Sequence, residues 1–385
     1  MDKIRSLYLE CLRVLAAFYV FIYHVGAGGF GQTLYFSTKN FNKKLCLTNL
    51  AAHYFVIIFF VLSGFLITMS VFKPAMTFKS FLIARLGRLY SVLIPALIFS
   101  YLVTFILIHG NYVPRSLIQN TNNLWIRFFL NIAFLTQTWS LCSTPPLNNP
   151  FWSVNYEFIY YLIIAVFFLI KSPRIKFSLL AIILLLACPK VLLLFPSWLS
   201  GALLFFFRDK TLTNKKMALA LFILSVFCLG AIMLNPHRIP FSKNENENDL
   251  YGLNLLFSWN YQADFIFSLI ISANIYFLFS ISNAIFVKTS GNILNKVHAF
   301  IMKIGSCSYT LYLFHLPLLF LFTVILPYNK TNHFHLAGLI ILVLSSVAII
   351  ARYTEWKVKW WRIIIEKLFN YLSLFVNKRN QPKNI

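Results

Sequence analysis

Charged residues are scarce in this sequence. Only 11% of its 385 residues are Asp, Glu, Lys or Arg, whereas about 25% are charged in an ordinary soluble domain. Hydrophobic residues make up 59% of the chain. Apolar stretches close to the ~20 residues that cross a bilayer recur from Leu12 to Ile350. This hydropathy excludes a large soluble helical protein and predicts an integral membrane protein.

Acidic residues are the rarest charged class, with 10 Asp and Glu against 34 Lys and Arg and a formal net charge of +24. The excess does not indicate a nucleic-acid partner, because the basic residues flank apolar stretches and do not form one solvated patch. In membrane proteins, Lys and Arg collect on the cytoplasmic side. Placing each dense basic cluster on that side predicts that both chain termini are cytoplasmic.

Cysteine shows no metal-binding pattern. The six Cys include no CxxC pair and no spacing typical of a metal site, so no metal is predicted. Cys46 and Cys142 both fall in loops placed outside, which leaves a disulfide between them open. A cleavable secretory signal is not predicted, because the first apolar segment carries Arg13 and His24, which the hydrophobic region of a signal would avoid.

The sequence predicts an all-α integral membrane protein with about ten transmembrane helices. The predicted spans are 11–28, 50–72, 89–109, 153–171, 177–194, 195–207, 217–235, 261–283, 304–326 and 334–353. The segment 126–140 is short and carries polar residues, and counting it as a span would move two later basic clusters outside. It is therefore predicted to be re-entrant or interfacial. Residues 1–353 are expected to form one membrane domain, and 354–385 a basic cytoplasmic tail attracted to anionic lipid.

Ionisable residues inside the spans are the first candidates for function, because each costs at least about 2.5–3.5 kcal/mol at mid-span. Arg13 and His24 lie eleven residues apart in the first span. At about 100° per residue this separation brings both to one helix face, about 16 Å apart along the axis. Arg13 then lies near the inner surface and His24 deep in the outer half. A single histidine is more often structural, but the aligned arginine favours an internal path lined by both.

Arg85 and Arg88 open the third span from the inside and share a helix face at i, i+3. Two interpretations stay open. The pair either anchors the helix by snorkelling to the membrane surface, or forms a fork-shaped clamp for an anion, since paired guanidinium groups bind phosphate well.

Glu157 lies near the outer end of its span, after Trp152 and Ser153. Its carboxylate either reaches water in the loop or orients a histidine, as carboxylates do in acyl-transfer triads. His24 falls at a similar predicted depth. His315, mid-span beside Pro317, is either a candidate site residue or a structural histidine bonded to the backbone that the proline frees.

Five motifs, in this order, resemble the membrane-bound acyltransferase family 3, which acylates surface polysaccharides and related glycans. They are Leu12-Arg13 to Ala17 with His24, Phe60 to Ile67, Arg85 with Arg88-Leu89-Tyr90, Trp152-Ser153 with Glu157, and Ser308 to His315. Val14 departs from the family's usual Gly. The run from Tyr156 to Ile159 keeps only the first carboxylate of a common Glu pair.

The resemblance implies an acyl-CoA-dependent O-acyltransferase of the bacterial cytoplasmic (inner) membrane. Its donor would be acetyl-CoA from the cytoplasm, and its acceptor a hydroxyl of a cell-surface or lipid-linked sugar outside. The implied roles are donor binding by Arg13, Arg85 and Arg88, catalysis by His24 as base or transient acyl carrier with Glu157, and further contributions from Trp152, Ser153, Tyr312 and His315. A succinyl or longer acyl chain stays open, as does a transporter or flippase for a lipid-linked glycan, because polar residues along one path also suit transport.

Overall fold

The computed structural model describes residues 3–27, 49–113, 115, 118–243, 249–250, 253–285, 292–326 and 332–379. Within these residues the chain is almost entirely helical. Its strands are limited to a short antiparallel pair, β1 (Asp249–Leu250) with β2 (Leu253–Asn254). The prediction of an all-α membrane protein is confirmed. Cys46, one half of the disulfide left open above, lies outside the described residues.

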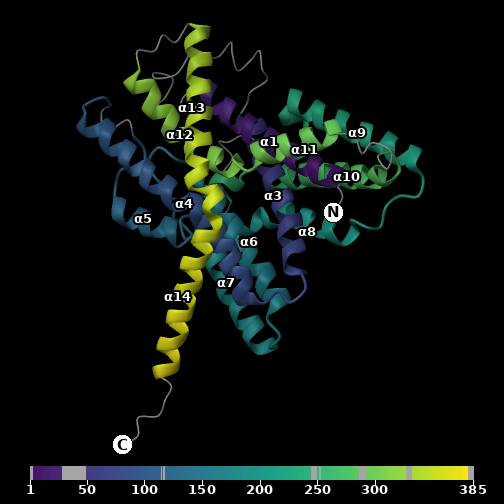
Figure 1. The fold of residues 1–385 in the computed structure, drawn as a ribbon, viewed down its shortest axis with the longest axis horizontal. Coiled ribbons are helices and arrows are strands. Elements are labelled where there is room, and N and C mark those ends of the chain that lie inside the picture. Colours follow the sequence, from purple (N-terminus) through teal and green to yellow (C-terminus); the bar gives the residue numbers. More distant parts are fainter. Residues whose placement is uncertain are drawn as a thin grey trace, which may run out of the picture.

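Ten apolar helices in the described part of the chain correspond to the ten predicted spans (Figure 1). They are α1 (Lys3–Ala27), α3 (Asn49–Val71), α4 (Phe78–His109), α6 (Phe151–Leu169), α7 (Pro173–Leu193), α8 (Phe195–Phe207), α9 (Lys215–Leu234), α10 (Tyr261–Ile285), α12 (Ser308–Ile325) and α13 (His333–Tyr353). All except the shorter α8 are long and apolar enough to cross a membrane. An amphipathic helix, α11 (Asn292–Gly305), precedes α12.

The expected tail begins as a helix. From α13 the chain passes through the single 3-10 turn η4 (Glu355–Lys357) into α14 (Val358–Arg379), so the apolar stretch runs from Phe334 to Tyr371. Figure 1 shows α14 leaving the bundle toward the C-terminus. It rests on α4 at Gly87, where an added Cβ would lie 2.6 Å from Cγ of Arg362. The close contact between the two helices therefore requires glycine at this position.

The segment predicted not to cross the membrane contains the short helix α5 (Leu124–Ile132). Its 9 residues rise about 14 Å, less than half of the hydrocarbon thickness of about 30 Å. Two tyrosines of α4 hold it: the hydroxyl of Tyr101 donates to the Leu124 carbonyl at 2.8 Å, and that of Tyr90 to the Ile132 carbonyl at 2.9 Å. This geometry agrees with a non-spanning segment.

Helices α3 and α8 pack with their backbones in close contact. A Cβ added at Gly64 would lie 2.1 Å from the carbonyl oxygen of Trp198, and one at Gly201 would lie 1.9 Å from that of Val61. Small residues allow membrane helices to approach in this way. The contact places α3 at the centre of the bundle, where it can contribute side chains to the cavities described below.

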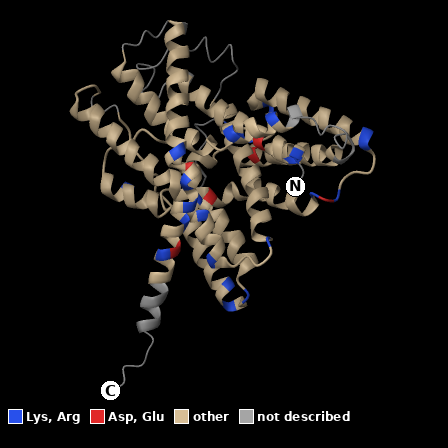
Figure 2. Ribbon diagram, viewed as in Figure 1, with Lys and Arg blue, Asp and Glu red and all other residues tan. Residues whose placement is uncertain are grey.

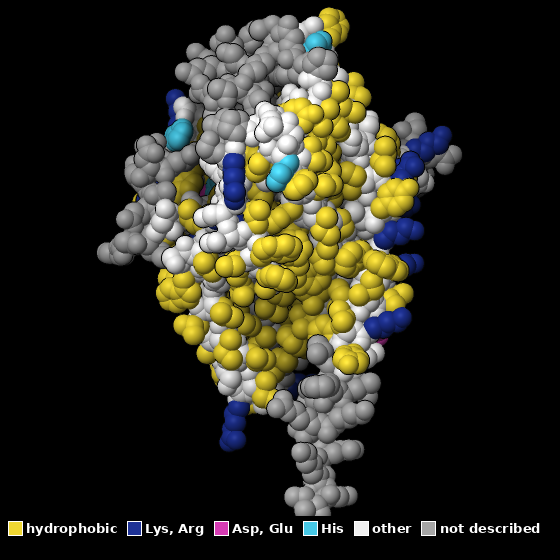
Figure 3. All heavy atoms as spheres, turned by 90° about the vertical axis from the view of Figure 1, so that its left-hand side faces the viewer, with side chains coloured by type: hydrophobic (Ala, Val, Ile, Leu, Met, Phe, Trp, Pro, Cys, Tyr) yellow, Lys and Arg dark blue, Asp and Glu magenta, His cyan; other side chains and the backbone are white. Residues whose placement is uncertain are grey.

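The outer surface of the bundle is apolar. Figure 3 shows one face covered by hydrophobic side chains, with Lys and Arg toward its margins. Helix α9 buries only Ala218 and Ser225, and large side chains such as Phe227 are exposed on it. In water this surface would be unfavourable, so it is the surface expected to face lipid. Ionised groups lie inside as well, near the junction of α13 and α14 (Figure 2).

Candidate functional site

Three arginines and a carboxylate from three helices line one cavity of about 120 Å³, which we call the arginine cavity. Arg13 comes from α1, Arg85 and Arg88 from α4, and Glu157 from α6. Glu157 interacts electrostatically with Arg85 and Arg88. The structure therefore brings together the three arginines that the family resemblance assigns to donor binding.

Carboxylates neutralise two of these arginines. Arg13 forms an ion pair with Glu10 at 2.9 Å, and Arg88 forms one with Glu355 of η4 at 3.4 Å. The second oxygen of Glu355 accepts hydrogen bonds from the amide and the hydroxyl of Thr310, at 3.1 and 3.2 Å. A buried carboxylate is stable only with such partners, so Glu355 holds Arg88 in the cavity wall from behind.

Arg85 differs from the other two arginines. Its Nη2 donates to the hydroxyl of Ser70 at 2.5 Å, whereas its Nε is buried without a hydrogen-bond partner among the described residues. Leaving a buried donor unpaired costs about 1–3 kcal/mol. Arg85 is thus the arginine of this cavity that has a buried donor without a partner among the described residues.

A larger cavity of about 370 Å³, which we call the histidine cavity, adjoins the arginine cavity. Its walls include His24 from α1, His53 from α3 and Trp152 from α6. Val56 and Tyr312 line both cavities. A path from the arginines to His24 therefore passes these two side chains.

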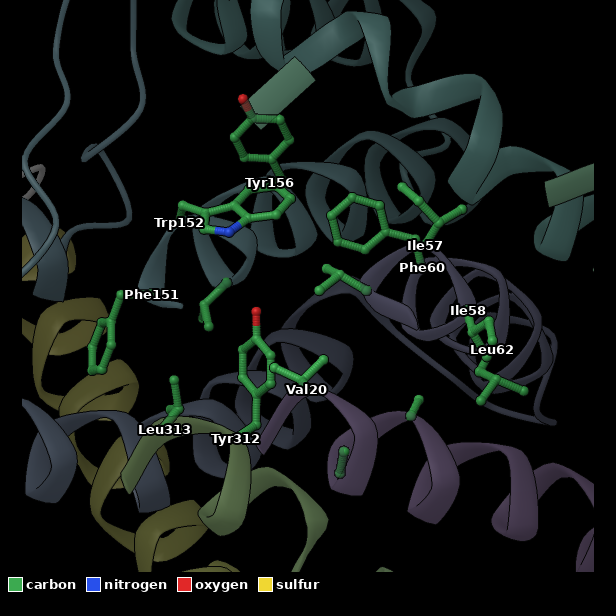
Figure 4. Packing of buried hydrophobic residues seen from close by; sticks show 14 of the residues in the cluster. Val20, Ile57, Ile58, Phe60, Leu62, Phe151, Trp152, Tyr156, Tyr312 and Leu313 are labelled. Carbon is green, nitrogen blue, oxygen red and sulfur yellow. The ribbon is translucent and has the colours of Figure 1, made fainter. Parts of the chain in front are cut away.

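Tyr312 is held at this boundary by Ser153. The Ser153 hydroxyl donates to the carbonyl of Pro150 at 3.2 Å, so it accepts the hydrogen bond from the Tyr312 hydroxyl, at 2.8 Å. Figure 4 shows the Tyr312 ring between Val20 of α1 and Trp152 of α6, with its hydroxyl directed toward α6. Both Ser153 and Tyr312, singled out from the sequence, thus lie where the two cavities meet.

Glu157 and His24, which were expected to lie together because of their similar depth, line different cavities. Glu157 lines the arginine cavity, His24 lines the histidine cavity, and no hydrogen bond joins them within the described residues. The imidazole of His24 instead lies beside that of His315, with ring centroids 5.1 Å apart. Depth along a helix does not determine which cavity a side chain enters, because that depends on the direction in which it points around the axis.

His315 is buried and bonded to its own helix. Its Nδ1 donates to the carbonyl of Leu311 at 2.9 Å, and its Nε2 has no partner among the described residues. Pro317 frees the carbonyl of Leu313, four residues earlier, and that carbonyl accepts the amide of Asn148 at 2.8 Å. The expectation that His315 bonds the backbone freed by the proline is therefore wrong.

A second histidine, His53, which the sequence marks as a weaker candidate in the second span, also lines the histidine cavity. His53 Nε2 lies 2.9 Å from Oδ2 of Asp264 on α10, a carboxylate with no exposed surface. Asp264 falls inside the predicted span 261–283, so the rule that ionisable residues in spans are candidates would have identified it. Within the described residues, no group of three or more His, Cys, Asp or Glu could hold a metal ion.

Comparison with known proteins agrees with this arrangement. A family model described as an acyltransferase domain matches residues 6–352, which include all the lining residues of both cavities. No curated protein and no solved structure matches the chain. Because the family model covers most of the chain, the chain belongs to the membrane-bound acyltransferase family 3.

Proposed function

We propose that this membrane acyltransferase transfers an acyl group, acetyl in the simplest case, from cytoplasmic acyl-CoA to a hydroxyl of a cell-surface or lipid-linked sugar on the outer side. The bacterial cytoplasmic membrane is the proposed location. One observation carries the proposal: a cavity lined by three arginines adjoins a cavity lined by His24. Transfer across a membrane requires such a connection between the site of the donor and that of the acceptor.

The arginine cavity suits the thin part of an acyl-CoA. A volume of about 120 Å³ is several times the roughly 10–15 Å³ that one water molecule needs on the same measure, so it accommodates a narrow chain. In the proposed complex the phosphates bind at the mouth, near Arg85, and the pantetheine arm extends past Tyr312. The thioester then reaches the histidine cavity.

The proposed chemistry takes place beside His24. The imidazole accepts the proton of the sugar hydroxyl as its oxygen attacks the thioester carbonyl. The carbon–sulfur bond breaks, the new ester keeps the acyl group, and the proton passes to the CoA thiolate. A neutral imidazole suits a base, and burial disfavours the charged form. His24 could act instead as a transient acyl carrier.

The experiment that tests this function is transfer of label from acyl-CoA. Purified protein in lipid nanodiscs is incubated with [14C]acetyl-CoA and with membranes that carry surface glycan but lack the protein. We expect label in the glycan together with release of free CoA. Label that stays in acetyl-CoA, with no free CoA released, would contradict acyl transfer and favour the transporter of a lipid-linked glycan.

A further inference from the structure

The His53–Asp264 pair plays no part in the chemistry proposed above, yet His53 lines the same cavity as His24. His53 belongs to α3 and Asp264 to α10, and their side chains are joined at 2.9 Å. The Asp264 carboxylate is further held by the amide of Asn260 at 3.4 Å, and that amide also donates to the hydroxyl of Tyr54 at 3.2 Å. The carboxylate is therefore fixed in one position.

A carboxylate fixed in this way determines which ring nitrogen of His53 carries the proton and which one faces the cavity as an acceptor. An ionised Asp264 accepts the N–H of Nε2, which leaves a lone pair on Nδ1. No described residue forms a hydrogen bond with Nδ1. His53 therefore offers the cavity a hydrogen-bond acceptor of fixed orientation, whereas a purely structural histidine would use both nitrogens inside the protein.

Aromatic rings form the wall around His53. Trp152 stacks on Phe257 with centroids 4.6 Å apart and planes 4° apart, and on His53 at 6.1 Å and 13°. Trp259 lies 6.0 Å from the His53 ring. All of these side chains line the histidine cavity. Flat apolar walls with a few fixed polar groups suit a sugar ring, whose C–H face is apolar and whose hydroxyls need partners.

We propose that His53, held by Asp264, is a positioning residue that recognises the acceptor sugar. Its Nδ1 accepts a hydrogen bond from one ring hydroxyl and thereby places a neighbouring hydroxyl beside His24. The two imidazoles line one cavity from different helices, α1 and α3. This inference rests on the proposed function, because it assigns the acceptor side of the same reaction.

The test compares the acceptor and donor constants of wild-type protein and His53→Gln in nanodiscs. The acceptors are octyl glucoside, octyl galactoside and octyl mannoside, and the donor is [14C]acetyl-CoA. Glutamine keeps an N–H donor for Asp264, so the buried carboxylate stays paired. We expect the acceptor KM to rise about tenfold, as for loss of one hydrogen bond to a ligand, with kcat within about threefold and the acetyl-CoA KM unchanged.

The control is His109→Gln. His109 is exposed at the end of α4, and it contacts Phe105 of the same helix through a hydrogen bond to the backbone carbonyl and stacking on the ring. This variant should leave both constants unchanged. Two results for His53→Gln would overturn the inference and leave the proposed function intact. One is an unchanged acceptor KM, and the other is a change in the donor KM alone. A wild-type protein that releases no CoA with any of the three glycosides would contradict the sugar acceptor and this inference together.

Discussion

The hydroxyl of Tyr312 lies 2.8 Å from Oγ of Ser153, which joins α12 to α6 at the boundary between the arginine cavity and the histidine cavity. The bond does not depend on the ligand, because Ser153 is satisfied on its other side by Pro150. Tyr312 is therefore a fixed wall of the connection. In the proposed complex, the acyl group passes this ring on its way from the arginine cavity to the histidine cavity.

Tyr312→Trp is expected to abolish acyl transfer, because a larger ring fills the connection between the cavities. Tyr312→Phe is the matched variant: it removes one hydrogen bond, should cost about 1 kcal/mol of stability, and should keep most of the activity. The measurement is label transfer from [14C]acetyl-CoA by both variants in nanodiscs. Wild-type transfer by Tyr312→Trp would mean that the donor takes another path.

His24→Ala is expected to lower kcat for transfer by at least about 100-fold, the contribution typical of a general base, while the protein stays folded in the membrane. His109→Ala, which removes an exposed histidine of α4, should leave kcat unchanged. Incubation without acceptor separates the two possible roles of His24: a base leaves the protein unlabelled, and an acyl carrier yields one labelled site. Wild-type activity of His24→Ala would exclude both roles.

Arg85→Ala and Arg88→Ala are expected to have different effects, the first on donor binding and the second on stability. Arg85 has an unpaired buried donor, so its loss should raise the acetyl-CoA KM about tenfold or more with little change in stability. Arg88 pairs with Glu355, whose side chain is 3% exposed, so its loss should leave a buried charge unpaired and cost about 2–3 kcal/mol. Donor titrations and thermal unfolding in detergent measure the two effects.

A second substitution checks the assignment of Arg88. Arg88→Ala combined with Glu355→Gln removes both charges and should recover part of the lost thermal stability. Equal melting temperatures for the single and double variants would show that the ion pair is not what stabilises this region.

Gly64→Ala is expected to destabilise the bundle by about 1–3 kcal/mol, because the new methyl group overlaps the Trp198 carbonyl and forces α3 and α8 apart. Gly230→Ala on α9 is the matched control, since a Cβ there meets nothing within 4 Å. It should be neutral or slightly stabilising. Thermal unfolding of the two variants in the same detergent provides the comparison, and equal melting temperatures would argue against close α3–α8 packing.

The helices themselves could be predicted from the sequence. Bilayer thickness fixes their length, and the free-energy cost of backbone N–H and C=O groups without hydrogen bonds in lipid favours helices over irregular structure. The grouping of Arg13 with Arg85 and Arg88 followed from positive residues near one surface and from the family motifs. The placement of Glu157 beside His24 could not be predicted reliably, because two helices of unknown rotation can place residues of equal depth in different cavities.

The His53–Asp264 pair shows a second limit of prediction from the sequence. An acidic residue in an apolar span was visible at position 264, and a histidine in another at position 53. Nothing in the sequence indicates that α3 and α10 are neighbours, so the partnership could come only from the fold. The same holds for Asn148, whose amide satisfies the carbonyl that Pro317 frees.

The Arg88–Glu355 ion pair shows that the functional protein extends beyond the residues that the family model matches. The family match stops at residue 352, but Glu355 and the α14 side chain that rests on Gly87 come after it. A protein shortened at the family boundary would keep every arginine of the site and lose the carboxylate that balances one of them. Residues beyond the family match thus support the arginine cavity, and shortening the chain there would leave Arg88 without its counter-charge.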